Sequence, residues 1–337
     1  MFKSGVWNQF RAVDHPDLKD LAAKVPDIVL KSRQDGTVKG YSAGFARWKR
    51  WASNYSEVKV LPAEPKYVAL YLTSIFQMSK SHAPVSNAYY SISWAHKQAC
   101  VNDPTSHDIV KRIKESALRV LGTGNNVKCP ISTDSLILLS KKFSCKNASL
   151  KDLRINCICL LAFAGFLRYD EFSKVICSDV KFFDTHMTIF VERSKTDVYR
   201  DGVQVYISRT DTLCCPVNAM SRYFHSAGFD FDSQEFLFRG LTYHRKFKKY
   251  TLRKQNKGLS YTCARDIVLH AFGSIGLNIK DFGTHSLRKG GATAASCHQV
   301  NDRLIKKHGR WLSDKSKDLY ISETIEEKLQ VTKNLGI

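Results

Sequence analysis

The first third of the chain carries apolar residues at the spacing of an α-helix. In residues 41–55 this spacing places Phe45, Trp48 and Trp51 on one side and the basic residues elsewhere. The same pattern recurs in three later segments, at 65–80, 86–101 and 106–121. We therefore expect four well-formed helices between residues 41 and 121, joined into a small all-helical domain.

Proline, glycine and serine positions predict where helices begin or stop. Pro65 suits the first turn of its helix, and Ser86 and Ser106 are the expected N-caps of the next two. In the first forty residues, prolines such as Pro26, together with Gly36, are expected to interrupt any long helix.

A run of turn-forming residues, GTGNN at 122–126, follows the last of these helices. Glycine and asparagine favour turns over helices or strands, so this run is the clearest linker in the chain. We place the domain boundary there, which gives one domain at 1–125 and a second at 126–337.

Beyond the boundary the pattern is first helical and then changes to extended. Ser132 or Thr133 is expected to cap a first helix, and a long apolar helix then reaches Gly165. Three segments rich in alternating, β-branched and aromatic residues follow, at 179–184, 186–194 and 202–208. They predict a three-stranded antiparallel sheet, so the fold is mainly α, with a mixed α+β second domain.

Charge is the first indication of function. The 337 residues carry a formal net charge of +21, and 43% of them are hydrophobic. That share is enough to bury proper cores, which excludes a disordered or fibrous protein. An excess of positive charge this large is typical of proteins that bind a polyanion; nucleic acid is the favoured partner and a membrane surface the alternative.

The ten cysteines do not follow a disulfide or zinc pattern. There is no Cys-x-x-Cys pair, and the closest spacings are Cys157 to Cys159 and Cys214 to Cys215. We expect free thiols and hence a reducing compartment. The first residues show no signal-peptide core, and no apolar run approaches the roughly 18 residues of a membrane span, so a soluble intracellular protein is expected.

Residues 245–257 contain seven basic side chains and no acidic one. Phe247 and Tyr250 are interleaved with these charges. A solvated loop is the plainer interpretation, but the net charge of the chain favours contact with a DNA backbone. The basic residues are Arg245, Lys246, Lys248, Lys249, Arg253, Lys254 and Lys257.

Six residues are candidates for chemistry. In chain order they are Arg168, Lys195, His285, Arg288, Trp311 and Tyr320. Taken singly, each has an ordinary explanation, such as a solvent-facing helix end, a hairpin lysine or a core tryptophan. Taken together, two arginines, an imidazole and an indole N–H can surround a phosphate, and a tyrosine hydroxyl can attack it.

The motifs FLRYDE, HSLRKGG and HGRW-x8-Y arrive in a fixed order with a lysine between two predicted strands. This set resembles the catalytic domain of the tyrosine recombinase (phage integrase) family over roughly residues 130–325. The variant HSLRKGGAT with HGRW is most similar to the Crypton and DIRS-type recombinases of eukaryotic mobile elements. The helical first domain is similar to that family's core-binding domain in size and helix content only. Trp311 stands where many bacterial members have histidine.

The resemblance implies a role for each candidate in a site-specific recombinase. Arg168 and Arg288 would clamp the non-bridging oxygens of a DNA phosphodiester, and Trp311 would donate to the same oxygens. Tyr320 would attack phosphorus and form a 3′-phosphotyrosine bond. His285 would either donate to the phosphate or take the tyrosine proton.

Two further residues complete the implied chemistry. Lys195 would protonate the departing 5′ oxygen, and Glu171, three residues after Arg168, would orient an arginine. No cofactor and no metal ion are expected, because the two arginines supply the positive charge that magnesium provides in other phosphoryl-transfer sites.

The expected partner is double-stranded DNA, clamped between the two domains and exchanged by a homotetramer on two duplexes. We expect no membrane association and no small-molecule ligand. The motif variant and the basic RKFKK run suggest a nuclear protein. Residues after Tyr320 are expected to form a tail helix; whether it docks on a neighbouring subunit, or Ile325 and Leu329 pack on their own domain, stays open.

Two other functions also stay open. The string SKDLY at 316–320 is similar to a motif of type IB topoisomerases, which nick and reseal one duplex. A domesticated protein that only binds DNA is the second alternative. Intact candidate residues argue against it, because a binding module has no use for the whole set.

Overall fold

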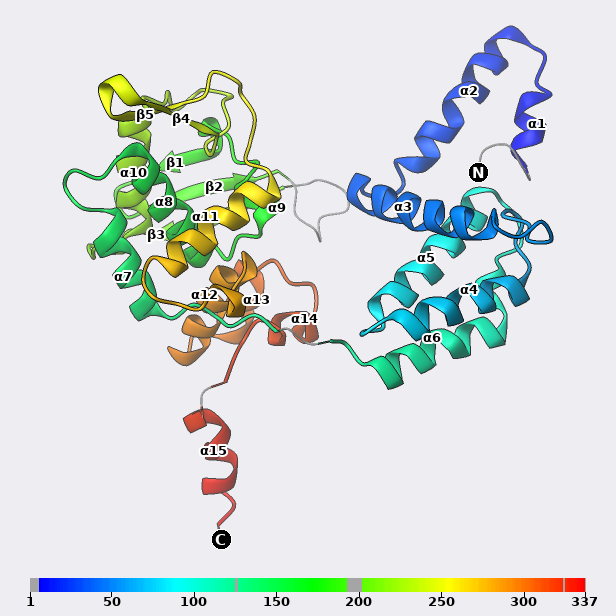
Figure 1. Cartoon of the computed structure of the whole chain (residues 1–337). Coiled ribbons are helices and arrows are strands. Elements are labelled where there is room, and N and C mark those ends of the chain that lie inside the picture. The colour runs from blue at the N-terminus through cyan, green and yellow to red at the C-terminus, as the bar shows by residue number, and fades with distance from the viewer. Residues whose placement is uncertain (1–5, 125–126, 193–201, 324, 337) are drawn as a thin grey trace. The chain divides into compact units, whose positions relative to one another are not determined.

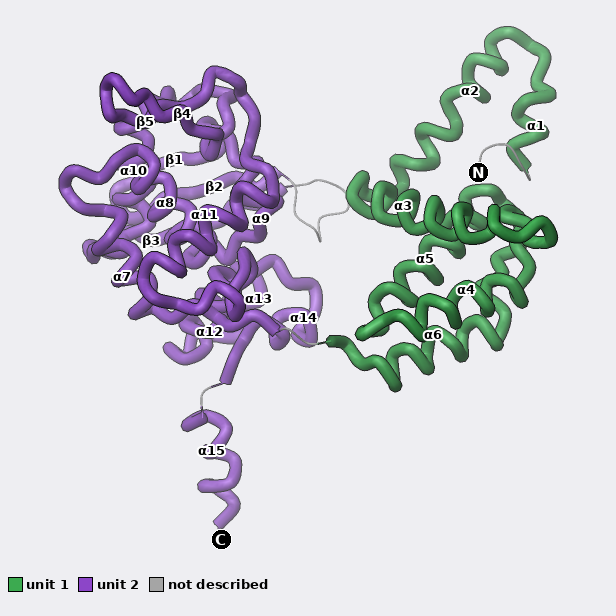
Figure 2. The backbone as a smooth tube through the Cα atoms, in the orientation of Figure 1, with its two compact units in different colours: residues 1–126 green, residues 127–337 purple. Residues whose placement is uncertain are grey.

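The chain forms two compact units (Figure 2). The computed structural model describes residues 6–124, 127–192, 202–323 and 325–336. Within the chain the units are Met1–Asn126 and Val127–Ile337, so the division falls at the end of the GTGNN run. We call them the N-terminal unit and the C-terminal unit and describe each by itself.

Helices make up the secondary structure of the N-terminal unit (Figure 1). They are α1 (Trp7–Arg11), α2 (Pro16–Leu30), α3 (Asp35–Ala52), α4 (Pro65–Met78), α5 (Ala83–Gln98) and α6 (Asp108–Leu121). The predicted apolar face of 41–55 is confirmed, because Trp48 is fully buried against Leu72 and Ile92. Its indole N–H donates to the carbonyl of Val60, so the buried polar atom is satisfied.

The expectation that Pro26 and Gly36 would interrupt a long helix was wrong. Pro26 lies inside α2, and Gly36 lies in the first turn of α3. No residue of α2 is buried, so water can bond the carbonyl that Pro26 leaves without a donor. In the first turn of α3, the backbone N–H groups have no partner within the helix in any case, so Gly36 reduces the stability of the helix little there.

The two serine N-caps were also predicted wrongly. α5 starts at Ala83 after His82, which leaves Ser86 inside the helix, because Pro84 has the φ angle that a first turn needs. α6 starts after His107, whose ring nitrogen accepts the Ile109 N–H. The prediction for Pro65 is confirmed, since it occupies the first turn of α4.

A buried helix, α8 (Leu150–Ala164), forms the centre of the C-terminal unit. Every residue from Leu153 to Ala162 is buried, including the polar Arg154 and Asn156, as expected for a helix surrounded by others. The surrounding helices are α7 (Thr133–Phe143), α10 (Pro216–Ala227), α11 (Tyr261–Gly273) and α12 (His285–Cys297). Ser132 caps α7, and α8 ends before Gly165, both as predicted.

The predicted three-stranded antiparallel sheet is present, in the order β1 (Val180–Phe182), β2 (His186–Val191) and β3 (Val203–Ser208). In β2 the register pairs Ile189 with both Val180 and Val205, and all three side chains are buried in the core. A second antiparallel pair, β4 (Leu241–His244) and β5 (Lys249–Leu252), was not predicted; β5 lies within the basic segment 245–257 and β4 directly precedes it.

The described part of the C-terminal unit also contains short α-helices, and the predicted fold class is confirmed. They are α9 (Tyr169–Phe172), α13 (Asp302–His308), α14 (Asp314–Asp318) and α15 (Ile325–Lys333). No described helix of either unit is both long and apolar enough to cross a lipid bilayer.

Two adjacent glycines let α12 closely approach the segment before α7 and the end of α8. A Cβ on Gly290 would lie 2.2 Å from the carbonyl oxygen of Ile131, and one on Gly291 would lie 2.2 Å from that of Phe163. Only glycine fits at such distances. The KGG of the HSLRKGG motif therefore brings α12, with His285 and Arg288, against the segment that carries Arg168.

Candidate active site

Arg168 follows the end of α8 and immediately precedes α9. Its backbone N–H donates to Glu171 Oε2 at 2.9 Å, and its guanidinium donates to Glu171 Oε1 at 2.8 Å. The Arg168 side chain is 12% exposed and Glu171 only 1%. One buried carboxylate thus holds both the backbone and the side chain of Arg168.

Glu171 also holds a second arginine and lies near a third. Arg310 Nη2 donates to its Oε2 at 2.7 Å, and Arg288 Nη1 stands 3.9 Å from the same oxygen. Burial by itself would raise the pKa of the Glu171 carboxyl. The guanidinium of Arg310, the N–H of Arg168 and the other two arginines outweigh burial and hold that pKa below its ordinary value. The group is therefore a carboxylate at neutral pH.

Arg288 is fully buried on α12, with no exposed surface. It donates to the carbonyl of Phe166 and, at 2.5 Å, to that of Gly309. Its guanidinium carbon lies 4.4 Å from the centre of the Trp311 ring and 5.0 Å from that of the Tyr320 ring. Burial and the nearby Arg168 lower the pKa of Arg288, which indicates a site that would be stabilised by an anion.

Arg288 Nε and Trp311 Nε1 have no hydrogen-bond partner among the described residues, and neither nitrogen is exposed. Buried donors are nearly always paired in folded proteins, and exceptions are often found where a ligand binds. Because the guanidinium lies 4.4 Å from the Trp311 ring centre, the two residues that carry these donors are neighbours, which suits an acceptor that approaches the pair.

Tyr320 lies two residues after α14 and faces the same cluster. Its hydroxyl oxygen is 3.5 Å from His285 Nδ1, and its ring centre is 5.3 Å from that of Trp311. The preceding turn is held in place, because the Tyr320 N–H donates to the carbonyl of Lys317, and the buried Lys317 ammonium bonds to Asp302 of α13. The structure therefore places a tyrosine hydroxyl within reach of an imidazole.

The structure thus brings five of the six candidates together: Arg168 and Arg288 lie beside Glu171, the Trp311 and Tyr320 rings lie against Arg288, and His285 lies beside Tyr320. They come from the segment after α8, from α12 and from the α13–α14 region, which are far apart in the chain. The sixth candidate, Lys195, lies outside the described residues.

Two residues of the HGRW motif were missed by the sequence analysis, which considered only its tryptophan. His308 has its Nε2 2.8 Å from the carbonyl of Ala164, at the end of α8. Arg310 donates to three backbone carbonyls as well as to Glu171. A basic residue next to a predicted active-site residue was the available signal, but sequence alone does not show which way it points.

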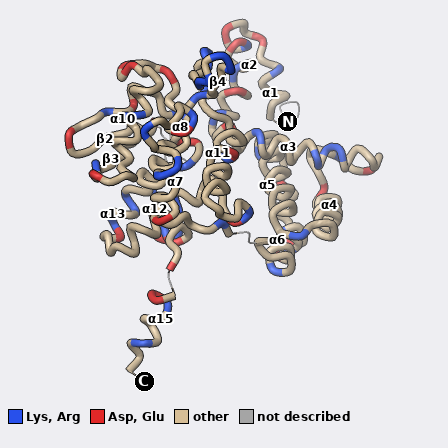
Figure 3. The backbone as a smooth tube through the Cα atoms, turned by 60° about the vertical axis from the view of Figure 1, so that its left-hand side comes forward, with Lys and Arg blue, Asp and Glu red and all other residues tan. Residues whose placement is uncertain are grey.

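The basic segment 245–257 is exposed along most of its length. Arg245, Lys246, Lys248 and Lys249, which we call the hairpin basic cluster, occupy the turn between β4 and β5 and the start of β5. Figure 3 shows lysine and arginine gathered at this hairpin. Exposed charge on a protruding turn suits contact with a polyanion, and the predicted role in DNA binding stays a prediction.

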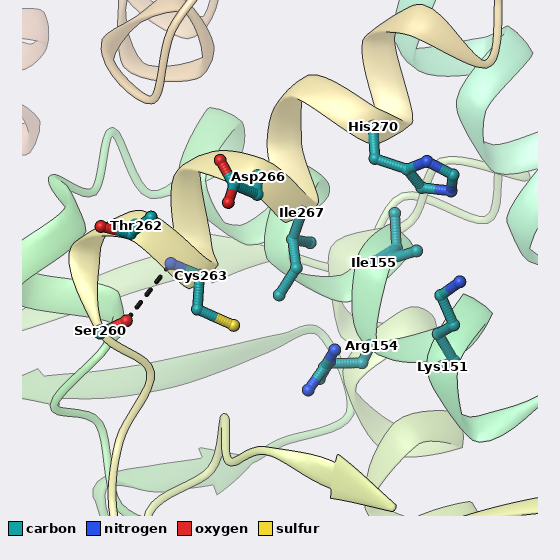
Figure 4. A pocket seen from close by; sticks show the side chains of 9 residues that line it. All are labelled: Lys151, Arg154, Ile155, Ser260, Thr262, Cys263, Asp266, Ile267 and His270. Atoms are coloured by element: carbon teal, nitrogen blue, oxygen red, sulfur yellow. Dashed lines mark hydrogen bonds between the residues drawn. The ribbon is translucent and has the colours of Figure 1, made fainter. Parts of the chain in front are cut away.

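A separate cavity of about 500 Å³ lies between α8 and α11 (Figure 4). Lys151, Arg154, Cys263 and His270 are among its lining residues. Arg154 is buried and donates to a backbone carbonyl at 2.6 Å, and burial lowers its pKa. None of the lining residues belongs to the cluster around Glu171. No group of three or more His, Cys, Asp or Glu in the described ranges is arranged to hold a metal ion.

A family model and a sequence relative both match this chain. The model of the phage integrase family matches residues 140–327. The integrase/recombinase xerD homolog of Selenomonas ruminantium is 28% identical over 307 residues, which cover 90% of this chain and 86% of that protein.

Solved structures of recombinases share the fold. The XerH site-specific recombinase bound to a palindromic difH substrate has a TM-score of 0.61 at 14% identity, covering 89% of this chain and 79% of that one. A lambda integrase dimer bound to a COC′ core site has a TM-score of 0.58 at 14% identity, covering 89% of this chain and 75% of that one. At such identities the likeness concerns the fold alone.

Proposed function

The chain belongs to the phage integrase family, and from that premise we propose that it is a site-specific DNA recombinase acting through a 3′-phosphotyrosine intermediate. The observation that carries the proposal is the position of Tyr320. Its hydroxyl faces His285, and its ring lies over Arg288, beside the unpaired indole N–H of Trp311. A nucleophile, a base and phosphate-binding donors are thus gathered from three separate segments.

The scissile phosphate would bind where the two unpaired donors lie. A phosphate oxygen would accept from Arg288 Nε and Trp311 Nε1, and the partly exposed Arg168 would hold a second oxygen. Because the Tyr320 ring covers the Arg288 guanidinium in the structure, it must shift when the phosphate enters. We propose that this shift places the hydroxyl in line with the bond to be broken.

Strand cleavage would then proceed as a transesterification. The Tyr320 oxygen forms a bond to phosphorus while the bond from phosphorus to the 5′ oxygen breaks. The tyrosine proton passes to His285, and Lys195 gives a proton to the departing oxygen. The arginines stabilise the extra negative charge of the pentacoordinate transition state, so the proposal includes no metal ion. Attack by a 5′ hydroxyl of another strand reverses each step.

Several finer features belong to the same proposal. The HSLRKGGAT and HGRW variants support a recombinase of Crypton or DIRS type, encoded by or derived from a eukaryotic mobile element and working in the nucleus. A solved lambda integrase tetramer is bound to a Holliday junction, and we propose a tetramer on two duplexes for this chain as well. In α15, Ile325 is 71% exposed and Leu329 is 45% exposed, which favours docking of the tail on a neighbouring subunit.

Covalent trapping tests the proposal. A binding site is first selected from a library of randomised duplexes with Tyr320→Phe protein, and it is then rebuilt as suicide substrates nicked beside each candidate cleavage position. Wild-type protein should give an adduct that survives denaturant, and Tyr320→Phe should bind without forming one. An adduct formed equally by Tyr320→Phe would refute the assignment of the nucleophile.

The same substrates separate the alternatives. A topoisomerase-like enzyme would form the adduct and reseal it but would join no strands between two duplexes. A protein that only binds DNA would form no adduct. A substrate with sulfur at the 5′ bridging position should restore cleavage by Lys195→Ala, because a thiolate leaves without protonation. Failure of that rescue would assign the general acid to another group.

A further inference from the structure

Arg310 occupies a backbone position that disfavours arginine. Its φ angle is +56°, in the left-handed region where glycine is at ease and other residues are strained. Gly309 directly before it has an ordinary helical φ, so the glycine of the motif does not relieve this position. An arginine held in a strained conformation indicates that its side chain is needed where it lies.

The Arg310 side chain is buried, with 6% exposed, and points away from solvent toward Glu171. Besides the bond to Glu171 Oε2, it donates to the carbonyls of Gly165 and Phe166 at the end of α8, and to that of His308. These bonds join the strained turn after α13 to the segment that leads into Arg168. Arg310 therefore lies behind the groups that would face a phosphate.

The two oxygens of Glu171 are divided between two arginines. Arg168 takes Oε1 through its guanidinium, and Arg310 takes Oε2 at 2.7 Å. Arg288 stands 3.9 Å from Oε2, beyond hydrogen-bond distance, and is held by backbone carbonyls instead. Arg310 thus keeps the carboxylate from capturing Arg288.

Charge leads to the same conclusion. Three guanidinium groups and one carboxylate leave two net positive charges in the cluster, and without Arg310 only one would remain. A phosphodiester carries one negative charge, whereas the pentacoordinate transition state carries two. The net charge of the intact cluster therefore matches the transition state better than the ground state, which is the condition for catalysis.

We propose that Arg310 is a positioning residue for strand cleavage. It occupies Glu171 so that the carboxylate orients Arg168 without withdrawing Arg288 from the phosphate. The rate effect rests on the proposed function, whereas the effect on the position of Arg288 does not. Arg310 itself does not contact the reacting atoms.

The kinetic test compares Arg310→Gln, Arg310→Lys and the double variant Arg310→Gln with Glu171→Gln. Single-turnover cleavage is measured with saturating suicide substrate, below the melting temperature of every variant. Arg310→Gln should cleave about 100-fold more slowly than wild type, and Arg310→Lys should be intermediate because it keeps the charge. Removing the Glu171 charge as well should recover roughly tenfold, since the carboxylate can then no longer capture Arg288.

A substrate with a neutral methylphosphonate at the scissile position distinguishes this role from a purely structural one. If Arg310 were only structural, the rate deficit of Arg310→Gln would be the same on both substrates. The transition state of the methylphosphonate carries one negative charge fewer, so the deficit of Arg310→Gln should shrink. An Arg310→Gln rate equal to wild type, or a double variant no faster than Arg310→Gln, would overturn the proposal. An equal rate deficit of Arg310→Gln on the phosphodiester and the methylphosphonate substrates would also overturn it.

Crystal structures of wild-type and Arg310→Gln protein test the same idea without activity. We expect Arg288 Nη1 to move from 3.9 Å to hydrogen-bond distance of Glu171 Oε2 in the variant. An Arg288 that stays in place would overturn the proposal. If wild-type protein forms no adduct, the proposed function fails, and the position of Arg288 alone decides this inference.

Discussion

Replacing Glu171 by glutamine should strongly destabilise the C-terminal unit. The carboxylate accepts two hydrogen bonds from Arg168 and one from Arg310, at 2.7–2.9 Å, and lies 3.9 Å from Arg288. A glutamine amide would accept with one oxygen only and would turn its NH₂ group toward a guanidinium. Three arginines would then share a buried site without a counter-charge.

The size of the effect follows from burial. Removing one partner of a buried ion pair costs about 3–5 kcal/mol, because the remaining charges stay desolvated. For a unit of roughly 200 residues, each kcal/mol lowers the Tm by about 2–4 °C. Glu171→Gln should therefore melt about 6–20 °C below wild type in scanning calorimetry at pH 7. Asp170→Asn is the matched control: it removes the neighbouring carboxylate, which is 75% exposed and 3.8 Å from Lys174, so its Tm should change by about 2 °C or less.

The pH dependence of the stability that Glu171 contributes is an independent test. Since the folded-state pKa of Glu171 lies below its ordinary value of 4.5, its stabilisation is fully present above that value and is lost as the pH falls through the lowered pKa. The difference between wild type and Glu171→Gln should thus be constant from about pH 8 to about pH 5 and shrink only in stronger acid. A Glu171→Gln protein with the same Tm as Asp170→Asn would refute the buried-cluster account.

Three further predictions concern packing, titration and DNA binding. Gly291→Ala should destabilise the C-terminal unit by about 1–3 kcal/mol, because its Cβ would meet the Phe163 carbonyl; Gly36→Ala, with nothing within 4 Å of its Cβ, should be neutral or stabilising in the same urea titrations. Burial lowers the pKa of His96 below 6.5, so wild-type protein should lose stability as the pH falls below 6.5, and His96→Gln should lose this dependence. Unfolding of the N-terminal unit can be followed by tryptophan fluorescence, since four of the five tryptophans lie in that unit. An equal pH dependence of stability in wild type and His96→Gln would contradict the assignment to His96. Replacing the hairpin basic cluster by glutamine should flatten the salt dependence of DNA binding, with the slope changing by about 0.9 for each phosphate that the variant no longer neutralises; an unchanged slope would exclude the hairpin from the interface.

Sequence reasoning succeeded where a pattern is repeated or a motif is ordered. The apolar run of α8 and the alternation of β1–β3 each involve many residues, so tertiary contacts reinforce what the pattern predicts. The motifs were informative for another reason: five candidate residues are distant in the chain, and only a specific fold brings them together.

It failed where one local preference competes with others. Ser86 and Ser106 are good N-caps in isolation, but Pro84 and His107 set the helix starts instead. The β4–β5 hairpin was missed because its basic residues hide the alternation of a strand. Arg310 could not be assigned from sequence, since its importance depends on a strained φ angle and on which of three arginines takes each oxygen of Glu171.

The central claim is that Tyr320, which lies beside His285, Arg288 and Trp311, attacks DNA. Peptide mass spectrometry of the trapped adduct tests it most directly, after digestion of both protein and DNA. The account predicts a nucleotide linked through its 3′ phosphate to the peptide that contains Tyr320, and release of a strand with a free 5′ hydroxyl. A linkage at another residue, or one through a 5′ phosphate, would contradict it.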